Sequence, residues 1–219
     1  MNRIQALPRA LALLAGLFML TGVLAAEPAE EGTDYQRLAK PVPVETGKQV
    51  EVVEFFWYRC PHCNQLEPSL EAWAKKLPAD VKFRAVPAIL NPNWLPAAKL
   101  HYALADLGAL DRLRGKAFDA YHKDKLDLDD EAVLMAWVKK QGLDAAKFKT
   151  AYHSFSVQTR AMKGAQTARN AGITGVPTLM VDGKYITSIS MTYTEERLFE
   201  VLDQLIQRAR SERGGKATK

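Results

Sequence analysis

The alternation of hydrophobic and polar residues divides the chain into strand-like and helix-like segments. The run Val50–Tyr58 is almost continuously apolar and rich in β-branched and aromatic residues, which is typical of a central strand covered on both faces. Val81–Ile89 predicts a second strand. Thr178–Val181 and Tyr185–Ile189 are joined by an Asp-Gly pair, which predicts a hairpin.

Between and after these strands, apolar residues recur at helical spacing. The order strand, helix, strand, helical run, hairpin and helix predicts an α/β fold. Residues 26–34 are acidic and small, which predicts a flexible leader, and residues 212–219 predict a disordered tail. The expected helices cover residues 61–76, 95–107, 110–122, 131–141, 145–155, 156–171 and 195–209.

The N-terminus has the pattern of an export signal. Arg3 and Arg9 precede the apolar run Ala10–Leu20, and small residues end at Ala25. The alternative is a membrane anchor, but a spanning helix needs about 20 apolar residues, and Thr21 interrupts this run too early. We expect residues 1–25 to be a cleaved signal peptide and the protein to be periplasmic.

The charge balance gives little support to nucleic-acid binding. The chain has 219 residues, which suits one domain or one domain with an insertion, and a formal charge of +5. Removing residues 1–25 takes away two arginines and leaves 5 − 2 = +3. This basic excess is weak and dispersed, so we expect no nucleic-acid partner.

The cysteine count is more informative. The only two cysteines of the chain, Cys60 and Cys63, lie three positions apart. Disulfides persist in exported proteins, but closing a loop of about four residues contributes only about 2 kcal/mol, against nearly 5 kcal/mol for a loop of about a hundred. A bridge this short stabilises a fold poorly. It is better suited to opening and closing.

The motif Cys60-Pro61-His62-Cys63 follows a strand and opens a helix. Backbone N–H groups and the helix dipole stabilise a thiolate at a helix N-terminus, which predicts that Cys60 is the exposed attacking sulfur and Cys63 the inner, resolving one. Pro61 suits the first helical position, and His62 lies beside Cys60, where its charge or its N–H further stabilises the anion. A stabilised thiolate favours the reduced form and makes the disulfide a stronger oxidant.

Other interpretations of this motif have less support. A zinc site lacks a second Cys-x-x-Cys pair, and the remaining histidines are scattered through predicted helices, so no metal is expected. Haem attachment requires histidine directly after the second cysteine, where Asn64 stands. His62 could still be an ordinary surface residue.

Glu54 is unusual inside an apolar strand, because an unpaired buried carboxylate is costly. One interpretation places it at a sheet edge or strand end. The other makes it a proton acceptor near Cys63, with a pKa raised by burial.

Three motifs in order, Glu54-Phe55-Phe56, Cys60-Pro61-His62-Cys63 and Gly175-Val176-Pro177-Thr178, resemble the DsbA family of bacterial periplasmic disulfide donors with a thioredoxin fold. Members of that family are known examples of low-pKa, strongly oxidising cysteine pairs.

The resemblance implies a cis Val176–Pro177 bond against the active-site cysteines. Gly175, Val176 and Pro177 would offer backbone groups to an extended substrate, in the manner of an added strand. It also implies an inserted all-helical domain that helps to form an apolar groove, because 177 − 63 = 114 positions separate Cys63 from Pro177. The expected parts are a thioredoxin-like first part at 35–90, the helical insertion at 91–155 and a thioredoxin-like second part at 156–211.

One position departs from the family pattern. Many relatives carry a lysine in the strand after the first helix, but here the inward position is Ala85, and Lys82 and Arg84 are expected to face outward. This departure puts in doubt any charge partner for Glu54.

The resemblance further implies a cofactor-free enzyme that is monomeric. It would donate the Cys60–Cys63 disulfide to exported proteins with free cysteines, and a quinone-linked membrane partner similar to DsbB would reoxidise it. One rival is a reduced disulfide isomerase or reductase, although the stretch between residues 25 and 50 is too short for the usual dimerisation domain. A non-catalytic chaperone that uses only the groove is another, and a metal-binding protein is the weakest.

Overall fold

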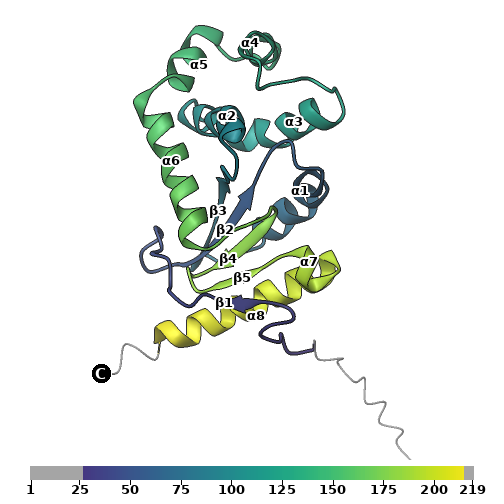
Figure 1. Cartoon of the computed structure of the whole chain (residues 1–219), viewed down its shortest axis with the longest axis vertical. Coiled ribbons are helices and arrows are strands. Elements are labelled where there is room, and N and C mark those ends of the chain that lie inside the picture. Colours follow the sequence, from purple (N-terminus) through teal and green to yellow (C-terminus); the bar gives the residue numbers. More distant parts are fainter. Residues whose placement is uncertain (1–26, 215–219) are drawn as a thin grey trace, which may run out of the picture.

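A computed structural model describes residues 27–214 (Figure 1). The predicted signal peptide, residues 1–25, lies outside the described residues. No helix in the described part is both long enough and apolar enough to cross a membrane.

A five-stranded sheet forms the centre of the fold, in the order β1-β5-β4-β2-β3. β2 (Val50–Phe56) lies between β3 (Val81–Pro87), to which it is parallel, and β4 (Thr178–Val181), to which it is antiparallel. β5 (Tyr185–Thr187) and the short β1 (Gln36–Arg37) complete the other edge. The apolar run of β2 correctly predicts the central, doubly covered strand, although β2, β3 and β5 each end two residues before their predicted limits.

The two faces of the sheet are covered by different helices (Figure 1). Val50 and Val52 of β2 pack with α1 (Pro61–Ala74) and α8 (Glu195–Gly214). Val53 and Phe55, which point the other way, pack against the C-terminal half of α6 (Phe155–Asn170). This alternation follows from the two-residue period of a strand.

Four further helices form the inserted domain above the sheet in Figure 1. They are α2 (Leu95–Asp106), α3 (Leu110–His122), α4 (Glu131–Lys140) and α5 (Ala145–Tyr152), preceded by an unpredicted 3₁₀ turn, η1 (Pro92–Trp94). Their apolar core extends into the sheet domain, where it includes Phe56, Tyr58 and Cys63. The thioredoxin fold with an inserted helical domain is thereby confirmed.

The helix expected over residues 145–155 is wrong at its end. α5 ends at Tyr152, and the Ser154 side chain caps α6 by accepting a hydrogen bond from the Val157 N–H at 3.1 Å. A serine cap of this kind starts a new helix, so Phe155 is the first residue of α6 rather than the last of α5.

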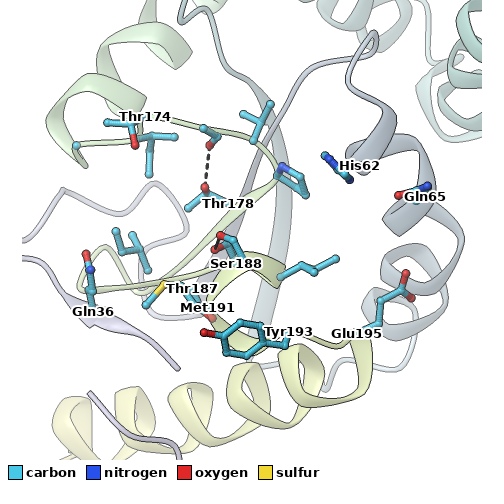
Figure 2. Close-up of a pocket in the computed structure, with 18 residues that line it drawn as sticks. Gln36, His62, Gln65, Thr174, Thr178, Thr187, Ser188, Met191, Tyr193 and Glu195 are labelled. Carbon is cyan, nitrogen blue, oxygen red and sulfur yellow. Dashed lines mark hydrogen bonds between the residues drawn. The ribbon is translucent and has the colours of Figure 1, made fainter. Parts of the chain in front are cut away.

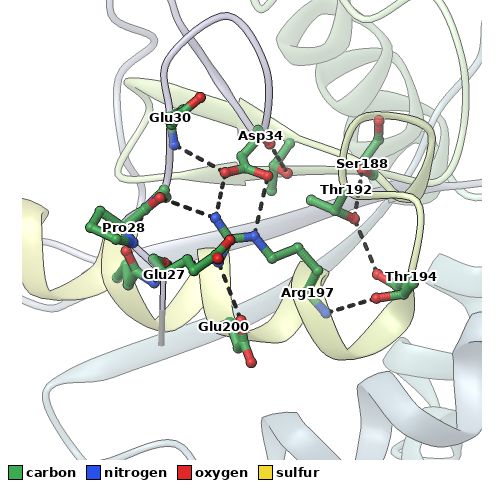
Figure 3. A network of polar contacts seen from close by, with 12 residues as sticks. Glu27, Pro28, Glu30, Asp34, Ser188, Thr192, Thr194, Arg197 and Glu200 are labelled. Carbon is green, nitrogen blue, oxygen red and sulfur yellow. Dashed lines mark hydrogen bonds and ion pairs between the residues drawn. The ribbon is translucent and has the colours of Figure 1, made fainter. Parts of the chain in front are cut away.

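The leader expected to be flexible is held in place over residues 27–34 (Figure 3). The Arg197 guanidinium in α8 donates to the backbone carbonyls of Glu27 and Pro28 at 2.8 and 3.1 Å. It also donates to both carboxylate oxygens of Asp34, at 3.2 and 2.6 Å. The acidic composition suggests flexibility, but Asp34 has a partner that lies 163 positions away.

The predicted disordered tail, residues 212–219, is also partly wrong, because α8 continues to Gly214. Glu212 accepts a hydrogen bond from Lys184 Nζ at 2.8 Å, and Arg213 Nε donates to Asp182 at 2.9 Å. These contacts to the β4–β5 hairpin keep the last turn helical. Residues 215–219 lie outside the described residues.

Candidate active site

Cys60 occupies the N-cap position of α1, where β2 has ended and the chain turns into the helix. Its backbone N–H donates to the Trp57 carbonyl at 3.0 Å, and its own carbonyl accepts from the Asn64 N–H at 3.1 Å, the first turn of the helix. Pro61 lies at the first helical position, as expected, and both cysteines are free thiols in this structure.

Several groups stabilise the Cys60 thiolate. A hydrogen bond from the Cys63 thiol lowers the pKa of Cys60 to about 6, helped by the backbone N–H groups of Cys63 and His62 and by the His62 charge, while burial opposes them. The His62 side chain is exposed beside the sulfur. Only 8% of Cys60 is exposed, so the nucleophile expected to be exposed is in fact largely covered.

Cys63 lies in the opposite environment. It is fully buried in the apolar core that the helical domain shares with Phe56 and Tyr58. Burial raises the pKa of Cys63 well above its ordinary value, and the hydrogen bond to Cys60 and the charge of Glu54 raise it further. The two sulfurs therefore differ strongly in acidity, and only Cys60 is suited to be a thiolate at neutral pH.

The loop before β4 meets the cysteines from the other side. The Val176–Pro177 bond is cis, which confirms the expectation from the resemblance. The Cys60 Sγ lies 3.4 Å from the Val176 carbonyl oxygen, to which the thiol donates. The Gly175 carbonyl accepts a hydrogen bond from Thr178 Oγ1 at 2.8 Å, which orders the loop. Val176 is half-buried and Gly175 is exposed, so backbone groups of this loop face solvent next to the nucleophile.

A cleft of about 610 Å³ begins at this junction. Figure 2 shows His62 and Gln65 of α1 on one side and the Thr174–Thr178 loop on the other, with Met191 and Tyr193 beyond β5. The lining combines apolar side chains, such as Ile186 and Met191, with polar ones, such as Gln65, Thr178 and Ser188, so the cleft offers both apolar contacts and hydrogen-bonding groups. The lining residues all lie outside residues 91–155, so the helical insertion does not form this cleft, contrary to the expectation from the resemblance. We refer to it as the active-site cleft.

Glu54 lies in the interior strand β2 and is fully buried, so the sheet-edge interpretation is wrong. The Arg114 Nη2 donates to Glu54 Oε2 at 2.6 Å and makes an ion-pair contact, also of 2.6 Å, with Glu67 Oε2, at an angle that is not that of a hydrogen bond. Burial raises the pKa of Glu54 and raises that of Glu67 to about 7, although Arg114 acts to lower both.

The sequence interpretation misses Arg114 as the partner of Glu54. Lys82 is exposed, as expected, but Arg84 is half-buried and pairs with the buried Glu51 at 2.9 Å. The cation comes instead from α3 of the inserted domain, 60 positions from Glu54. The available signal is the position of this arginine on the apolar stripe of that helix, whose buried members are Leu113, Ala117, Phe118, Ala120 and Tyr121.

The inserted domain also holds the backbone that leads into Cys60. His122 Nε2 of α3 is 2.8 Å from the Tyr58 carbonyl oxygen, and the buried Tyr58 hydroxyl is 3.2 Å from Nδ1 of His101 in α2. Arg59 forms ion pairs of 3.1 and 2.9 Å with Asp127 and Asp129. The helical domain therefore fixes the segment before the nucleophile in addition to covering it.

Within residues 27–214, no group of three or more histidine, cysteine or acidic side chains is placed to hold a metal ion. The structure instead brings the predicted residues into one constellation. His62 and Val176 line the active-site cleft, Cys60 contacts Val176 at its border, and Cys63 and Glu54 are buried nearby.

A helix-capping Cys-x-x-Cys pair opposite a cis-proline loop defines a thioredoxin-fold protein that performs thiol–disulfide exchange. The family model of the DSBA-like thioredoxin domain matches residues 69–205. The chain belongs to this family and is a protein disulfide oxidoreductase.

Individual relatives agree over nearly the whole chain. The thiol:disulfide interchange protein DsbA of Burkholderia cepacia is 37% identical over 204 residues, which covers 92% of this chain and 96% of the relative. Solved structures are similar as well. Pseudomonas aeruginosa DsbA has a TM-score of 0.79 at 34% identity, covering 83% of this chain and 94% of that one. The oxidoreductase NmDsbA1 from N. meningitidis has a TM-score of 0.76 at 33% identity, covering 84% and 96%.

Proposed function

We propose that the protein donates the Cys60–Cys63 disulfide to newly exported proteins in the periplasm, and that a quinone-linked membrane partner similar to DsbB reoxidises it. The observation that carries the direction of transfer is the environment of Cys60. A thiolate with a pKa of about 6 stabilises the reduced form, so the oxidised form gives its disulfide away readily. The cleft next to Cys60, with its mixed apolar and polar lining, suits unfolded chains, and the basic signal-like N-terminus supports export.

In the proposed reaction, a client thiolate attacks the Cys60 Sγ of the oxidised enzyme. The Cys60–Cys63 bond breaks, a mixed disulfide forms, and Cys63 leaves as a thiolate. A second client thiolate then attacks the client sulfur of the mixed disulfide. The client leaves oxidised, and Cys60 leaves as the stabilised thiolate. The electron pair passes from the client dithiol to the enzyme, so the products balance.

Glu54 is proposed to supply the proton that Cys63 needs. Burial raises the pKa of both groups, so a Cys63 thiolate in this core takes a proton readily. Glu54 Oε1 has no hydrogen-bond partner in the described part of the chain, and Arg114 stabilises the carboxylate left behind. When the enzyme is reoxidised, the same proton returns to Glu54. We propose the backbone of Gly175, Val176 and Pro177 as the client-pairing strand, in which Gly175 is exposed, Val176 half-buried and Pro177 buried.

The redox equilibrium of the cysteine pair with glutathione tests the direction of transfer. The cysteine pair of a donor should remain largely reduced in buffers where glutathione is partly oxidised. Ultraviolet absorbance of the thiolate should show that half of Cys60 is ionised near pH 6. A strongly reducing pair with an ordinary thiol pKa would instead make the protein a reductase or isomerase. The family assignment would survive that result.

The order of the two sulfurs has a separate test. Cys60→Ser should abolish disulfide transfer, because it removes the attacked sulfur. Cys63→Ser should accumulate client adducts, visible on non-reducing gels, when its Cys60 thiolate attacks client disulfides in a periplasmic extract, because a client thiolate leaves and no Cys63 sulfur is present to release the adduct. Adducts formed through Cys63 in the Cys60→Ser variant would refute the assigned order.

A further inference from the structure

A second hollow, of about 720 Å³, lies between α6 and the connection from β3 to α2. Ile89, Leu90, Pro92 and Leu95 form one wall, and Met162 and Ala165 of α6 form the other. No role in the reaction described above uses these residues. We refer to this feature as the α6 hollow.

The α6 hollow is continuous with the active-site cleft. Ile173 and Thr174, which lead into the cis-proline loop, line both the α6 hollow and the active-site cleft. Leu90, Ile173 and Val176 also belong to one apolar cluster. A chain bound along Val176 would reach this shared segment after about three extended residues, or ~10 Å. The hollow therefore begins where a chain leaving the cleft would arrive.

The chemistry of the hollow is apolar with one cation at its border. Met162 is 45% exposed, which is high for a large apolar side chain with nothing covering it. Arg169 is exposed and donates to Gln166 Oε1 at 2.8 Å, and within residues 27–214 it takes part in no ion pair. A ligand with an apolar side chain next to a carboxylate would cover Met162 and pair with Arg169.

We propose that the α6 hollow is a second subsite for the client polypeptide. It would hold an apolar client side chain against Met162 and Leu90, and a neighbouring acidic client residue would pair with Arg169. The client is favoured as occupant because the hollow shares Ile173 and Thr174 with the cleft. This inference rests on the proposed disulfide-donor function and extends it to client selection.

The test compares dithiol peptides of two lengths. A short peptide carries two cysteines, and extended peptides add Leu and Glu about four residues from the reacting cysteine, on its N-terminal or its C-terminal side. The ratio of kcat/KM for extended to short peptide is measured for each enzyme. We expect one extended form to react about tenfold faster than the short peptide, as is typical for seating an apolar group in a pocket.

Met162→Glu should remove this advantage, and the matched control Phe155→Glu should retain it. Phe155 is on the same helix and 85% exposed, but it does not line the hollow. For a second variant, Arg169→Glu, peptides whose extension carries Lys in place of Glu are also measured. Wild type should prefer the Glu peptide, and Arg169→Glu should prefer the Lys peptide. Because Met162 and Arg169 are both exposed, neither substitution disturbs the core.

The outcomes separate the two proposals. If the wild-type protein oxidised no peptide, the proposed function would fail. If it oxidised every peptide, but the ratio were the same in wild type and in Met162→Glu, only the second subsite would be refuted. A change in self-association of Met162→Glu by light scattering, with the ratio unchanged, would also refute it and would assign the hollow to a second copy of the chain.

Discussion

Two buried or half-buried arginines hold carboxylates in this protein, with opposite results. Arg197 makes hydrogen bonds to Asp34 and to two backbone carbonyls, and the bonds to Arg197 lower the pKa of Asp34 despite burial. Arg114 faces Glu54 and Glu67, yet burial raises the pKa of both carboxyls. The same pairing therefore favours the charged form at one site and not at the other.

The two networks differ in how many of their polar atoms have hydrogen-bond partners. Around Arg114, the Arg114 Nε and Glu54 Oε1 have no hydrogen-bond partner among the described residues. The carboxylates of Glu54 and Glu67 also repel each other, and they share Arg114 as their cation. Buried ion pairs of this kind contribute little to stability, because desolvation offsets the attraction. We conclude that the Arg197 network serves to anchor the chain, and that the Arg114 network is suited to proton exchange beside the cysteines.

Removing Arg114 should produce the largest effect. Arg114→Met leaves two carboxyl groups buried without a cation, and we expect a loss of about 3–5 kcal/mol in the free energy of unfolding at pH 8. The loss should be smaller at pH 5, because the carboxyls are then protonated and need no cation. Urea unfolding at both pH values measures it. Arg210→Met, which breaks only an exposed pair with Asp80, is the control.

An equal loss at pH 5 and pH 8 would contradict this account. It would mean that Arg114 acts by packing on the Phe56 ring, which lies 4.7 Å from its guanidinium carbon, rather than by charge.

The next effect concerns the pH dependence of stability. Glu67 has an ordinary pKa of 4.5 and a folded pKa of about 7. Between these values the folded protein binds more protons than the unfolded chain, so its stability falls as pH rises through this window. Glu67→Gln mimics the protonated form and should remove this fall, on the order of 3 kcal/mol. Thermal unfolding from pH 4 to pH 8 measures the slope, and an unchanged slope would place the proton on Glu54 instead.

Arg197→Ala should have a smaller effect, about 1–2 kcal/mol, through lost hydrogen bonds at a half-buried site. The lowered pKa of Asp34 contributes stability above its ordinary value of 3.8, which is lost as pH falls through the folded pKa. The difference between variant and wild type should therefore be largest near neutral pH and shrink below pH 4. Limited proteolysis should also cut residues 27–34 faster, and equal cleavage would show that other contacts anchor this segment.

Features of the fold and site that depend on neighbouring residues can be predicted from the sequence. The β2 run is apolar on both faces, and the cysteines follow it directly, so the central strand and the N-terminal position of Cys60 can both be predicted. Ser154 could also have been recognised as a helix cap between α5 and α6. These features depend on neighbouring residues only.

The remaining features depend on residues far apart in the chain. Arg114 approaches Glu54 only because the inserted domain folds over β2, and Asp34 has a partner only because α8 returns to the start of the domain. The partial covering of Cys60 likewise needs the cis-proline loop, more than a hundred positions away. No periodicity along the chain encodes these approaches.

The anchoring of residues 27–34 has a consequence for the order in which the protein can be completed. The ribosome makes this segment before any other part of the described chain, whereas Arg197 and Gln204, which hold it, belong to the last helix. The Ala29 N–H and Gln204 Oε1 are 175 positions apart, and contacts between such distant residues form late because a long loop must close first. In a nascent chain, residues 27–34 therefore lack these contacts until synthesis is almost finished. The native state is complete only when α8 has been made and has bound this segment.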